Sequence, residues 1–381
     1  MAIPDRAAGN WAHLYLAGWP FRFTPKGSPN EVWADRKRLK EQIDRLLWDW
    51  SRHDPSSIHV MWADLGAGKS HTLRYIQRCS LADKSLRIMP IYAVMPKQLR
   101  SFTEVYQAIL TGFDLPLLAQ KFSMKYRESG SKESAARELF PSIPDAVSAL
   151  LALQSDKETV RMIAAYWLRA GTELSKGQLD SIGVLRKLKT TDDAVAMLSG
   201  LFRIIVEPSS YRRVVVMLDE FQRIGEFKRA VGEGINRGLQ TLYDATPDGL
   251  TLVLSFGVGA ESFVRPLLSP EILDREHRPG LTVPLFSRKE VLEFAAELLA
   301  TFRLEGAPSS WFPISSAQAE LIAATLTSRG PATPRAVMKG FESVFKDADF
   351  RITRGMKLDW SNRDLATMVQ AAVQGLALEA D

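Results

Sequence analysis

Residues 63–70 read Ala-Asp-Leu-Gly-Ala-Gly-Lys-Ser and directly follow an apolar run, Ile-His-Val-Met-Trp, at residues 58–62. A strand that leads into a glycine-rich turn and then into a helix is typical of a phosphate-binding loop. Gly66 and Gly68 would let the main chain come close enough to phosphate oxygens for backbone N–H groups to bind them. The pattern therefore predicts a nucleoside triphosphate site in this turn.

Each polar position of the turn has a chemical reason. Lys69 would reach the β and γ phosphates, and Ser70 would ligate Mg²⁺. The helix that starts near Lys69 would point the positive end of its dipole at the bound anion. The usual motif begins with glycine, whereas Ala63 stands at that place here. We expect the nucleotide to contact Asp64, Leu65, Gly66, Ala67, Gly68, Lys69, Ser70 and His71.

A second motif strengthens the first. Residues 214–218 read Val-Val-Val-Met-Leu and are followed by Asp219 and Glu220, which indicates a buried central strand with two carboxylates at its carboxyl end. In parallel sheets ligands bind at that edge. Asp219 would hold Mg²⁺ through a water, and Glu220 would polarise the water that attacks the γ-phosphate. Either motif alone fits an ordinary turn or strand end, but together they predict a magnesium-dependent ATPase that converts ATP to ADP and phosphate.

Composition limits the class of protein. With 381 residues, 46% of them hydrophobic, the chain can bury a substantial core. No apolar stretch approaches the roughly 20 residues that span a bilayer, and the first residues lack the pattern of a secretion signal. The single cysteine, Cys79, fits a reducing compartment, so we expect a cytoplasmic protein without a membrane partner. The formal charge of +5 is compatible with nucleic acid as a partner without establishing it.

The chain divides into an N-terminal arm, a core and a helical end. We expect the arm at residues 1–30, the core at 31–286 and an all-helical lid at 287–381. Helical periodicity without β-branched runs predicts a helical insertion in the core at about 97–210, with Asp192 capping its last helix. A further buried strand at 250–257 carries Ser255 near its end. Ser255 would touch the attacking water or the γ-phosphate, or it is simply a strand end.

These features together resemble the AAA+ ATPases, in the branch of replication initiators, transposition regulators and secretion-associated ATPases. The resemblance rests on the loop at 63–70, the strand before Asp219, the strand that carries Ser255 and a lid segment. In that segment Gly-Pro-Ala-Thr-Pro-Arg at 330–335 is similar to the family's Gly-x-Pro-Arg, and Asp-Glu-Phe-Gln-Arg at 219–223 is similar to its Asp-Glu-Ala-Gln-Arg. It implies an α/β P-loop fold with a central parallel sheet flanked by helices, a helical insertion and a C-terminal helical lid.

The resemblance also implies roles for single residues. Arg335 would contact the γ-phosphate, although on its own it is an ordinary residue at a helix start. Trp33 and Arg36 lie in a segment similar to the one that holds adenine in the initiator branch. Such ATPases act as oligomers in which an arginine from one subunit completes the neighbour's site. Arg275 is the first candidate for that role and Arg278 the second, and both equally fit surface charges.

Some features of the resemblance are weaker or missing. No polar residue at the end of the second strand, at residues 86–95, is identified as the family's glutamate switch. Two stretches of the insertion, at 167–171 and 178–184, are similar to ATPases of bacterial phage-exclusion (BREX) islands. The resulting hypothesis is an AAA+ ATPase that oligomerises with ATP, on DNA, and regulates a partner protein encoded nearby in phage defence or in a mobile element.

Two alternatives stay open. One is a signalling NTPase switch that a protein partner activates, with turnover nearly incidental. The other is an ABC-type ATPase, because Leu-Ser-Gly at residues 198–200 stands upstream of the acidic strand, where that class has a Leu-Ser-Gly-Gly-Gln signature. The second glycine and the glutamine are absent, and Leu198 also belongs to the apolar face of a predicted helix.

Overall fold

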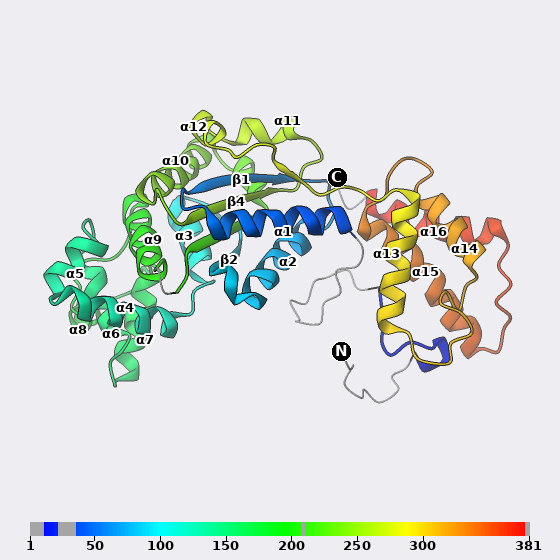
Figure 1. The fold of residues 1–381 in the computed structure, drawn as a ribbon, viewed down its shortest axis with the longest axis horizontal. Coiled ribbons are helices and arrows are strands. Elements are labelled where there is room, and N and C mark those ends of the chain that lie inside the picture. Colours follow the sequence, from blue (N-terminus) through cyan, green and yellow to red (C-terminus); the bar gives the residue numbers. More distant parts are fainter. Residues whose placement is uncertain (1–10, 22–35, 208–209, 378–381) are drawn as a thin grey trace. The chain divides into compact units, whose positions relative to one another are not determined.

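A computed structural model of the protein describes residues 11–21, 36–207 and 210–377. Its centre is a sheet of five parallel strands in the order β2-β3-β4-β1-β5 (Figure 1). The strands are β1 (Ser57–Trp62), β2 (Ile88–Val94), β3 (Arg213–Asp219), β4 (Leu250–Phe256) and β5 (Leu281–Thr282). Every residue of β3 and β4 is buried, as expected for apolar strands that are covered on both faces. The prediction of a parallel sheet is confirmed.

β2 lies at the edge of the sheet. It contains Pro90, which lacks a backbone N–H group and is therefore tolerated only where no strand follows on that side. The proline favours either a bulge or an edge position, and the structure has the edge. β1 lies on the other side of the central pair, next to β4, with Met61 opposite Ser255.

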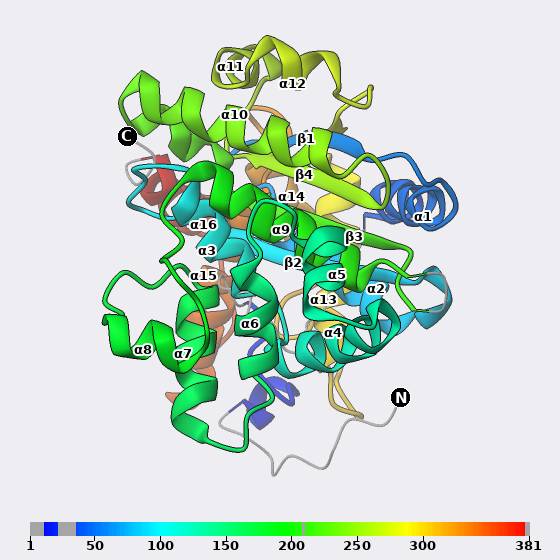
Figure 2. The same cartoon turned by 90° about the vertical axis from the view of Figure 1, so that its left-hand side faces the viewer.

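Helices cover both faces of the sheet (Figures 1 and 2). α1 (Lys37–Arg52) and α2 (Lys69–Ala82) lie on one face. α10 (Arg229–Ala245) lies on the other face, where it packs on α3 (Phe102–Leu110) and α9 (Thr191–Ile205) of the insertion. After β4 the chain forms the short helices α11 (Glu261–Val264) and α12 (Pro270–Asp274) before it reaches β5. Because the strands are parallel, their carboxyl ends all lie on one edge of the sheet.

In the described residues, the insertion between β2 and β3 contains helices joined by loops and no strand. Its helices are α3 (Phe102–Leu110), α4 (Leu115–Ser129), α5 (Lys132–Leu139), α6 (Asp145–Ala152), α7 (Glu158–Leu168), α8 (Lys176–Ser181) and α9 (Thr191–Ile205). The predicted cap of the last helix is wrong. Thr190, not Asp192, is the N-cap, because its hydroxyl accepts the Asp193 N–H group while the Asp193 carboxylate accepts the Thr190 N–H group.

By its internal contacts the chain forms two compact units. Unit 2 comprises Ile43–Trp62 and Leu73–Thr282 and holds the sheet and the insertion. Unit 1 comprises Met1–Gln42, Ala63–Thr72 and Val283–Asp381. The glycine-rich turn therefore belongs, by its contacts, with the helical lid, although the chain on either side of it belongs with the sheet.

Unit 1 is built around four helices, α13 (Arg288–Phe302), α14 (Ser316–Leu326), α15 (Pro334–Thr353) and α16 (Asn362–Ala377). Residues 11–21 of the N-terminal arm pack on them, with Leu14, Leu16 and Phe21 buried in the same apolar core as Phe341 and Phe345. Leu16 also forms an antiparallel bridge with Arg303. In the described part of the chain, no helix combines the length and the apolar character needed to cross a membrane.

Candidate functional site

The glycine-rich turn has the conformation that its sequence predicts. β1 ends at Trp62 and α2 begins at Lys69. Gly66 and Gly68 have φ angles of +81° and +97°, in the left-handed region that favours glycine. A Cβ atom on Gly66 would also lie 3.1 Å from Cβ of Arg335. Position 66 therefore favours glycine for two reasons, its left-handed backbone and the nearness of Arg335.

Inside the turn, the side chain of Lys69 folds back over the loop. Its ammonium group donates hydrogen bonds to the carbonyl oxygens of Ala63, at 2.8 Å, and Asp64, at 2.9 Å. The first turn of α2 is closed by Thr72, whose hydroxyl donates to the carbonyl of Gly68 at 3.0 Å. Ser70 and His71 lie half-buried in that same first turn of α2, between Lys69 and Thr72. The loop thus places a cation and a hydroxyl at the start of a helix, which is a suitable arrangement for phosphate.

Arg36 contacts the turn directly. It is 8% exposed, and its guanidinium donates to the carbonyl of Ala67 at 2.5 Å and to that of Pro284 at 3.2 Å. The same group lies 4.8 Å from the centre of the Phe286 ring. In this structure Arg36 holds the glycine-rich turn against the start of the lid, while its predicted contact with adenine stays a prediction. Trp33 lies outside the described residues.

The lid contacts the turn a second time through Arg335. This residue lies in the first turn of α15, after the N-cap Thr333 and the first-turn proline, Pro334. Its N–H group donates to the carbonyl of Gly66 at 3.4 Å. The guanidinium of Arg335 makes no hydrogen bond or ion pair with another residue in the described ranges. A cationic side chain of unit 1 thus remains available beside the glycine turn.

Asp219 is the centre of the second group of side chains, which lies within unit 2. It ends β3 and is 2% exposed. Its Oδ1 accepts hydrogen bonds from the Glu220 N–H group at 2.9 Å and from the Ser255 hydroxyl at 3.2 Å. Its Oδ2 accepts one from the Tyr92 hydroxyl at 2.8 Å. The structure therefore brings Ser255 to Asp219, and the predicted contact of Ser255 with water or phosphate stays a prediction.

The register of the sheet shows on which edge this carboxylate lies. Leu218 is opposite Leu254, and Ser255 is opposite Met61, so the last residues of β3, β4 and β1 lie on one edge of the sheet. The chain leaves β1 at that edge and continues directly into the glycine-rich turn. Ligands of parallel α/β sheets bind at this edge.

Glu220 follows in the left-handed conformation, with φ at +58°, and its side chain is 41% exposed. Its carboxylate forms an ion pair with Arg223, whose guanidinium also donates to the carbonyl of Met95 after β2. Gln222 accepts the N–H group of Gly257, after β4, at 2.8 Å. The segment after β3 thus fixes the ends of both neighbouring strands, and Glu220 is held by a cation of its own segment.

Tyr92 is a further candidate site residue that the sequence alone does not reveal, since no polar group was identified near the end of the second strand. It lies two residues before the end of β2. The guanidinium of Arg74, on α2, lies 4.6 Å from the centre of its ring. A single phenol in an otherwise apolar strand was the available signal, but only the pairing of β2 with β3 shows that it reaches Asp219.

Arg275 and Arg278 lie far from Asp219 of the same chain. Glu276 forms a bridge with Ile58 at the start of β1, so this segment is at the amino edge of the sheet, opposite the edge that holds Asp219. Arg275 forms an ion pair with Asp244 at 3.0 Å, and Arg278 pairs with Glu276 at 3.6 Å. Neither arginine can serve the carboxylates of its own subunit, so a catalytic role for either would have to be in a neighbouring subunit.

The ABC-type alternative is contradicted by α9. Ser199 is buried within this helix and donates to the carbonyl of Ala245 at 3.1 Å. Gly200 packs so closely on Phe140 that a Cβ atom would lie 2.1 Å from the ring. Leu198 is buried as well. The Leu-Ser-Gly triplet is therefore part of a helix core and is not presented to a nucleotide.

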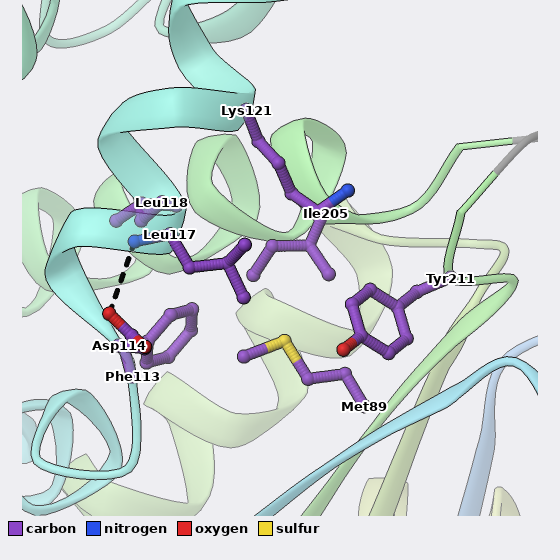
Figure 3. A pocket seen from close by; sticks show the side chains of 8 residues that line it. All are labelled: Met89, Phe113, Asp114, Leu117, Leu118, Lys121, Ile205 and Tyr211. Atoms are coloured by element: carbon purple, nitrogen blue, oxygen red, sulfur yellow. Dashed lines mark hydrogen bonds between the residues drawn. The ribbon is translucent and has the colours of Figure 1, made fainter. Parts of the chain in front are cut away.

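A crevice between the insertion and the sheet is separate from these groups. Figure 3 shows its lining, in which the apolar side chains of Met89, Phe113 and Ile205 point toward one another and Lys121 lies at the rim. It adjoins a cavity of about 330 Å³ near Arg87. Lys121 is paired there with Glu207, at 4.0 Å. This crevice is formed by packing at the start of β2 and is not at the carboxyl edge of the sheet.

No protein-family model and no curated protein matches the sequence. Solved structures do. ORC2 of Aeropyrum pernix, in ADPNP and ADP complexes, is 13% identical with a TM-score of 0.54, over 94% of this chain and 74% of that one. A Walker-type ATPase of Pyrococcus abyssi is 12% identical with a TM-score of 0.53, over 95% and 78%. Drosophila ORC bound to DNA is 14% identical with a TM-score of 0.50, over 99% and 68%. The chain therefore has the α/β P-loop fold of the AAA+ ATPases, with a helical insertion and a C-terminal helical lid.

Proposed function

We propose that the protein binds ATP with Mg²⁺ and hydrolyses it to ADP and phosphate. The observation that carries the proposal is the edge of the sheet at which β1 runs into the glycine turn while β3 ends in Asp219, beside Ser255. Lys69 would bind the β and γ phosphates and Arg335 the γ-phosphate. Glu220 would take the proton of the attacking water.

The side chains fit a magnesium ion. Mg²⁺ prefers oxygen ligands and retains several waters, and the Ser70 hydroxyl and the Asp219 carboxylate are donors of that kind. Ser70 would bind the ion directly and Asp219 through a water. When bound, the ion would neutralise charge that develops on the transferred phosphoryl group.

The test of nucleotide binding is Lys69→Ala. We expect it to weaken binding of a fluorescent ATP analogue at least about tenfold, since it removes a charge-assisted hydrogen bond. Lys84→Ala is the matched control, because Lys84 is an exposed lysine just after α2 that contacts neither the loop nor Asp219. Equal affinity of the Lys69→Ala variant and the wild type would show that the turn is not the phosphate site.

We further propose that the protein is cytoplasmic, oligomerises with ATP, acts on DNA, and regulates a partner protein in phage defence or in a mobile element. The position of Arg275 at the far edge of the sheet is compatible with assembly, because from there it could complete only the site of a neighbouring subunit. The likeness to Drosophila ORC bound to DNA supports DNA as a partner. The similarity of residues 167–171 and 178–184 to ATPases of phage-exclusion islands supports the defence role.

Mass measurement with and without ATP tests the assembly. ATPase rates with and without duplex DNA, at two salt concentrations, test the DNA partner, since contacts to phosphates make binding steeply salt-dependent. A larger mass with ATP and a salt-sensitive stimulation by DNA are the expected results. An unchanged mass would refute assembly, and a rate that DNA leaves unchanged at both salts would refute DNA coupling.

A second candidate function is a signalling switch that a protein partner activates. One observation favours it: the carboxylate of Glu220 is held by Arg223 in the isolated chain. In a switch, ATP would bind tightly and turn over slowly until a partner displaced Arg223. Tight binding with slow turnover, both with and without DNA, would favour this candidate over the DNA-coupled ATPase.

A further inference from the structure

Tyr92 is linked to the metal-binding candidate Asp219 across two strands. In the parallel register of β2 and β3, Tyr92 is opposite Met217, and Val94 is opposite Asp219. The tyrosine side chain therefore reaches diagonally to a residue two positions further along the neighbouring strand, a distance that long aromatic side chains span. Its hydroxyl donates to Oδ2 of Asp219 at 2.8 Å.

The hydrogen bonds of Asp219 decide what its carboxylate can still do. An ionised carboxylate has about four acceptor sites, two on each oxygen. Oδ1 uses both, for the Glu220 N–H group and the Ser255 hydroxyl. Oδ2 uses one, for Tyr92. One acceptor site of the carboxylate remains. It is on Oδ2, the oxygen that also accepts the Tyr92 hydroxyl.

We propose that Tyr92 is a positioning residue of the magnesium site, which orients Asp219 so that Oδ2 accepts the metal-bound water. This inference rests on the proposed ATPase function. The ring of Tyr92 is itself held by the guanidinium of Arg74, 4.6 Å from the ring centre. Arg74 belongs to α2, the helix that begins at Lys69 of the phosphate loop. The phenol thus joins that helix to the carboxylate.

The test is Tyr92→Phe, which keeps the ring and its contact with Arg74 and removes only the hydroxyl. We expect the Mg²⁺ concentration that gives half-maximal ATPase activity to rise about fivefold, which corresponds to about 1 kcal/mol, the net value of one hydrogen bond. Binding of the ATP analogue in EDTA should not change. A hydrogen bond that only stabilised the fold would lower the midpoint of urea unfolding without moving the Mg²⁺ dependence.

Tyr75→Phe is the matched control. The Arg78 guanidinium lies 5.3 Å from the centre of the Tyr75 ring. The Tyr75→Phe variant also loses a hydroxyl contact, to Cys79. It has no contact with Asp219, so its Mg²⁺ dependence should equal that of the wild type. An equal Mg²⁺ dependence of Tyr92→Phe and the wild type would overturn the inference.

Ser255→Ala gives an independent test if Tyr92→Phe does not fold. It removes a donor from Oδ1, the oxygen that is not left for the metal-bound water. The half-saturating Mg²⁺ concentration should then change less than twofold, and a larger change would refute the assignment of Oδ2. Failure of the proposed function looks different: the wild type itself would then show no Mg²⁺-dependent hydrolysis, and Asp219→Asn would change nothing.

Discussion

The guanidinium of Arg36 donates a hydrogen bond to the main-chain carbonyl of Ala67, 2.5 Å away, in the middle of the phosphate loop. This hydrogen bond fixes the orientation of the Ala67 carbonyl within the turn. Arg36 is held in turn by the Pro284 carbonyl and the Phe286 ring, at the start of the lid. The shape of the loop therefore depends on a residue outside the glycine motif.

Arg36→Ala should weaken binding of an ATP analogue about tenfold, because a hydrogen bond from a charged group to the loop is lost. Arg36→Lys should not restore it, since a single ammonium cannot stack on Phe286 and donate to two carbonyls as the planar guanidinium does. Fluorescence titration measures both. Arg38→Ala, which removes an exposed arginine two residues away, is the control. Normal affinity of Arg36→Ala would mean that the loop keeps its shape without this contact.

Glu220→Gln should lower the rate of ATP hydrolysis about 100-fold or more while ATP stays bound, because an amide cannot take the proton of the attacking water. Single-turnover assays with retained nucleotide measure both effects. Glu226→Gln, at the exposed end of the same short helix, Phe221–Glu226, is the control and should leave the rate unchanged. If Glu220→Gln hydrolyses ATP at the wild-type rate, the base is another group.

Arg275→Ala should impair neighbouring subunits rather than its own. Mixed with the wild type, it should lower ATPase activity more than in proportion to its share, because a transition-state arginine is worth at least about 1,000-fold in rate. Asp244→Asn is the matched variant, since it removes the partner of Arg275 but keeps the arginine. It should retain activity in the same mixtures.

The comparison of these two variants separates the roles. If the ion pair with Asp244 were only structural, both variants would lose activity alike. A strictly proportional loss with Arg275→Ala would point to Arg278, or to a protein that acts as a monomer.

His59 makes stability depend on pH. Burial, and then the charges of His277 and Arg213, lower its pKa from 6.5 to about 3, so the folded state holds the ring neutral while it accepts the Trp50 N–H group at 3.0 Å. A lowered folded-state pKa means that the stability is present above pH 6.5 and is lost as the pH falls. The free energy of unfolding should drop by about 1.4 kcal/mol per pH unit between pH 6 and pH 4.

Urea melts of the wild type and of His59→Gln measure this slope. Glutamine keeps an acceptor for Trp50 and does not titrate, so the variant should have a smaller slope over the same range. Identical slopes would assign the pH dependence to other groups.

Arg213→Met should destabilise unit 2 by about 3–5 kcal/mol, because it leaves buried carbonyls without a donor. The side chain is 1% exposed, and its guanidinium donates to the carbonyl oxygens of Trp50, His53, Asp54, Pro55 and Leu250 and to the hydroxyl of Thr251. Arg212→Met is the control, since its ion pair with Asp54 is exposed and worth less than about 1 kcal/mol. Equal urea midpoints of the two variants would contradict this role.

The strands around the site could be predicted from the sequence because β1, β3 and β4 are short apolar runs that end in polar residues or glycines. The same pattern correctly places Asp219 and Ser255 at one edge of the sheet. What it does not contain is the order of the strands. Tyr92 contacts Asp219 only because β2 is the neighbour of β3, and no local feature of either strand specifies that pairing.

The contacts of Arg213 and Arg36 could not be predicted from the sequence either, because they also join segments that are distant along the chain. An arginine at the start of a strand normally extends into water, whereas Arg213 is enclosed largely by carbonyls of residues 50–55, more than 150 residues away in sequence. Arg36 was assigned to adenine through resemblance, and its contact with Ala67 depends on how the chain before α1 meets the loop and the lid. Long-range packing, rather than local propensity, determines both positions.

The division of unit 1 into three separate stretches of sequence has a consequence for synthesis on the ribosome. Its N-terminal stretch pairs Leu16 with Arg303 and shares a core with α13–α16, so this unit cannot form its core until residues 283–377 have emerged. Unit 2, whose sheet is complete at Thr282, can fold earlier. At synthesis rates of about 5–20 residues per second, the glycine turn then waits several seconds for the partners that shape it. A nascent chain would therefore acquire its affinity for nucleotide only after this helical stretch has emerged.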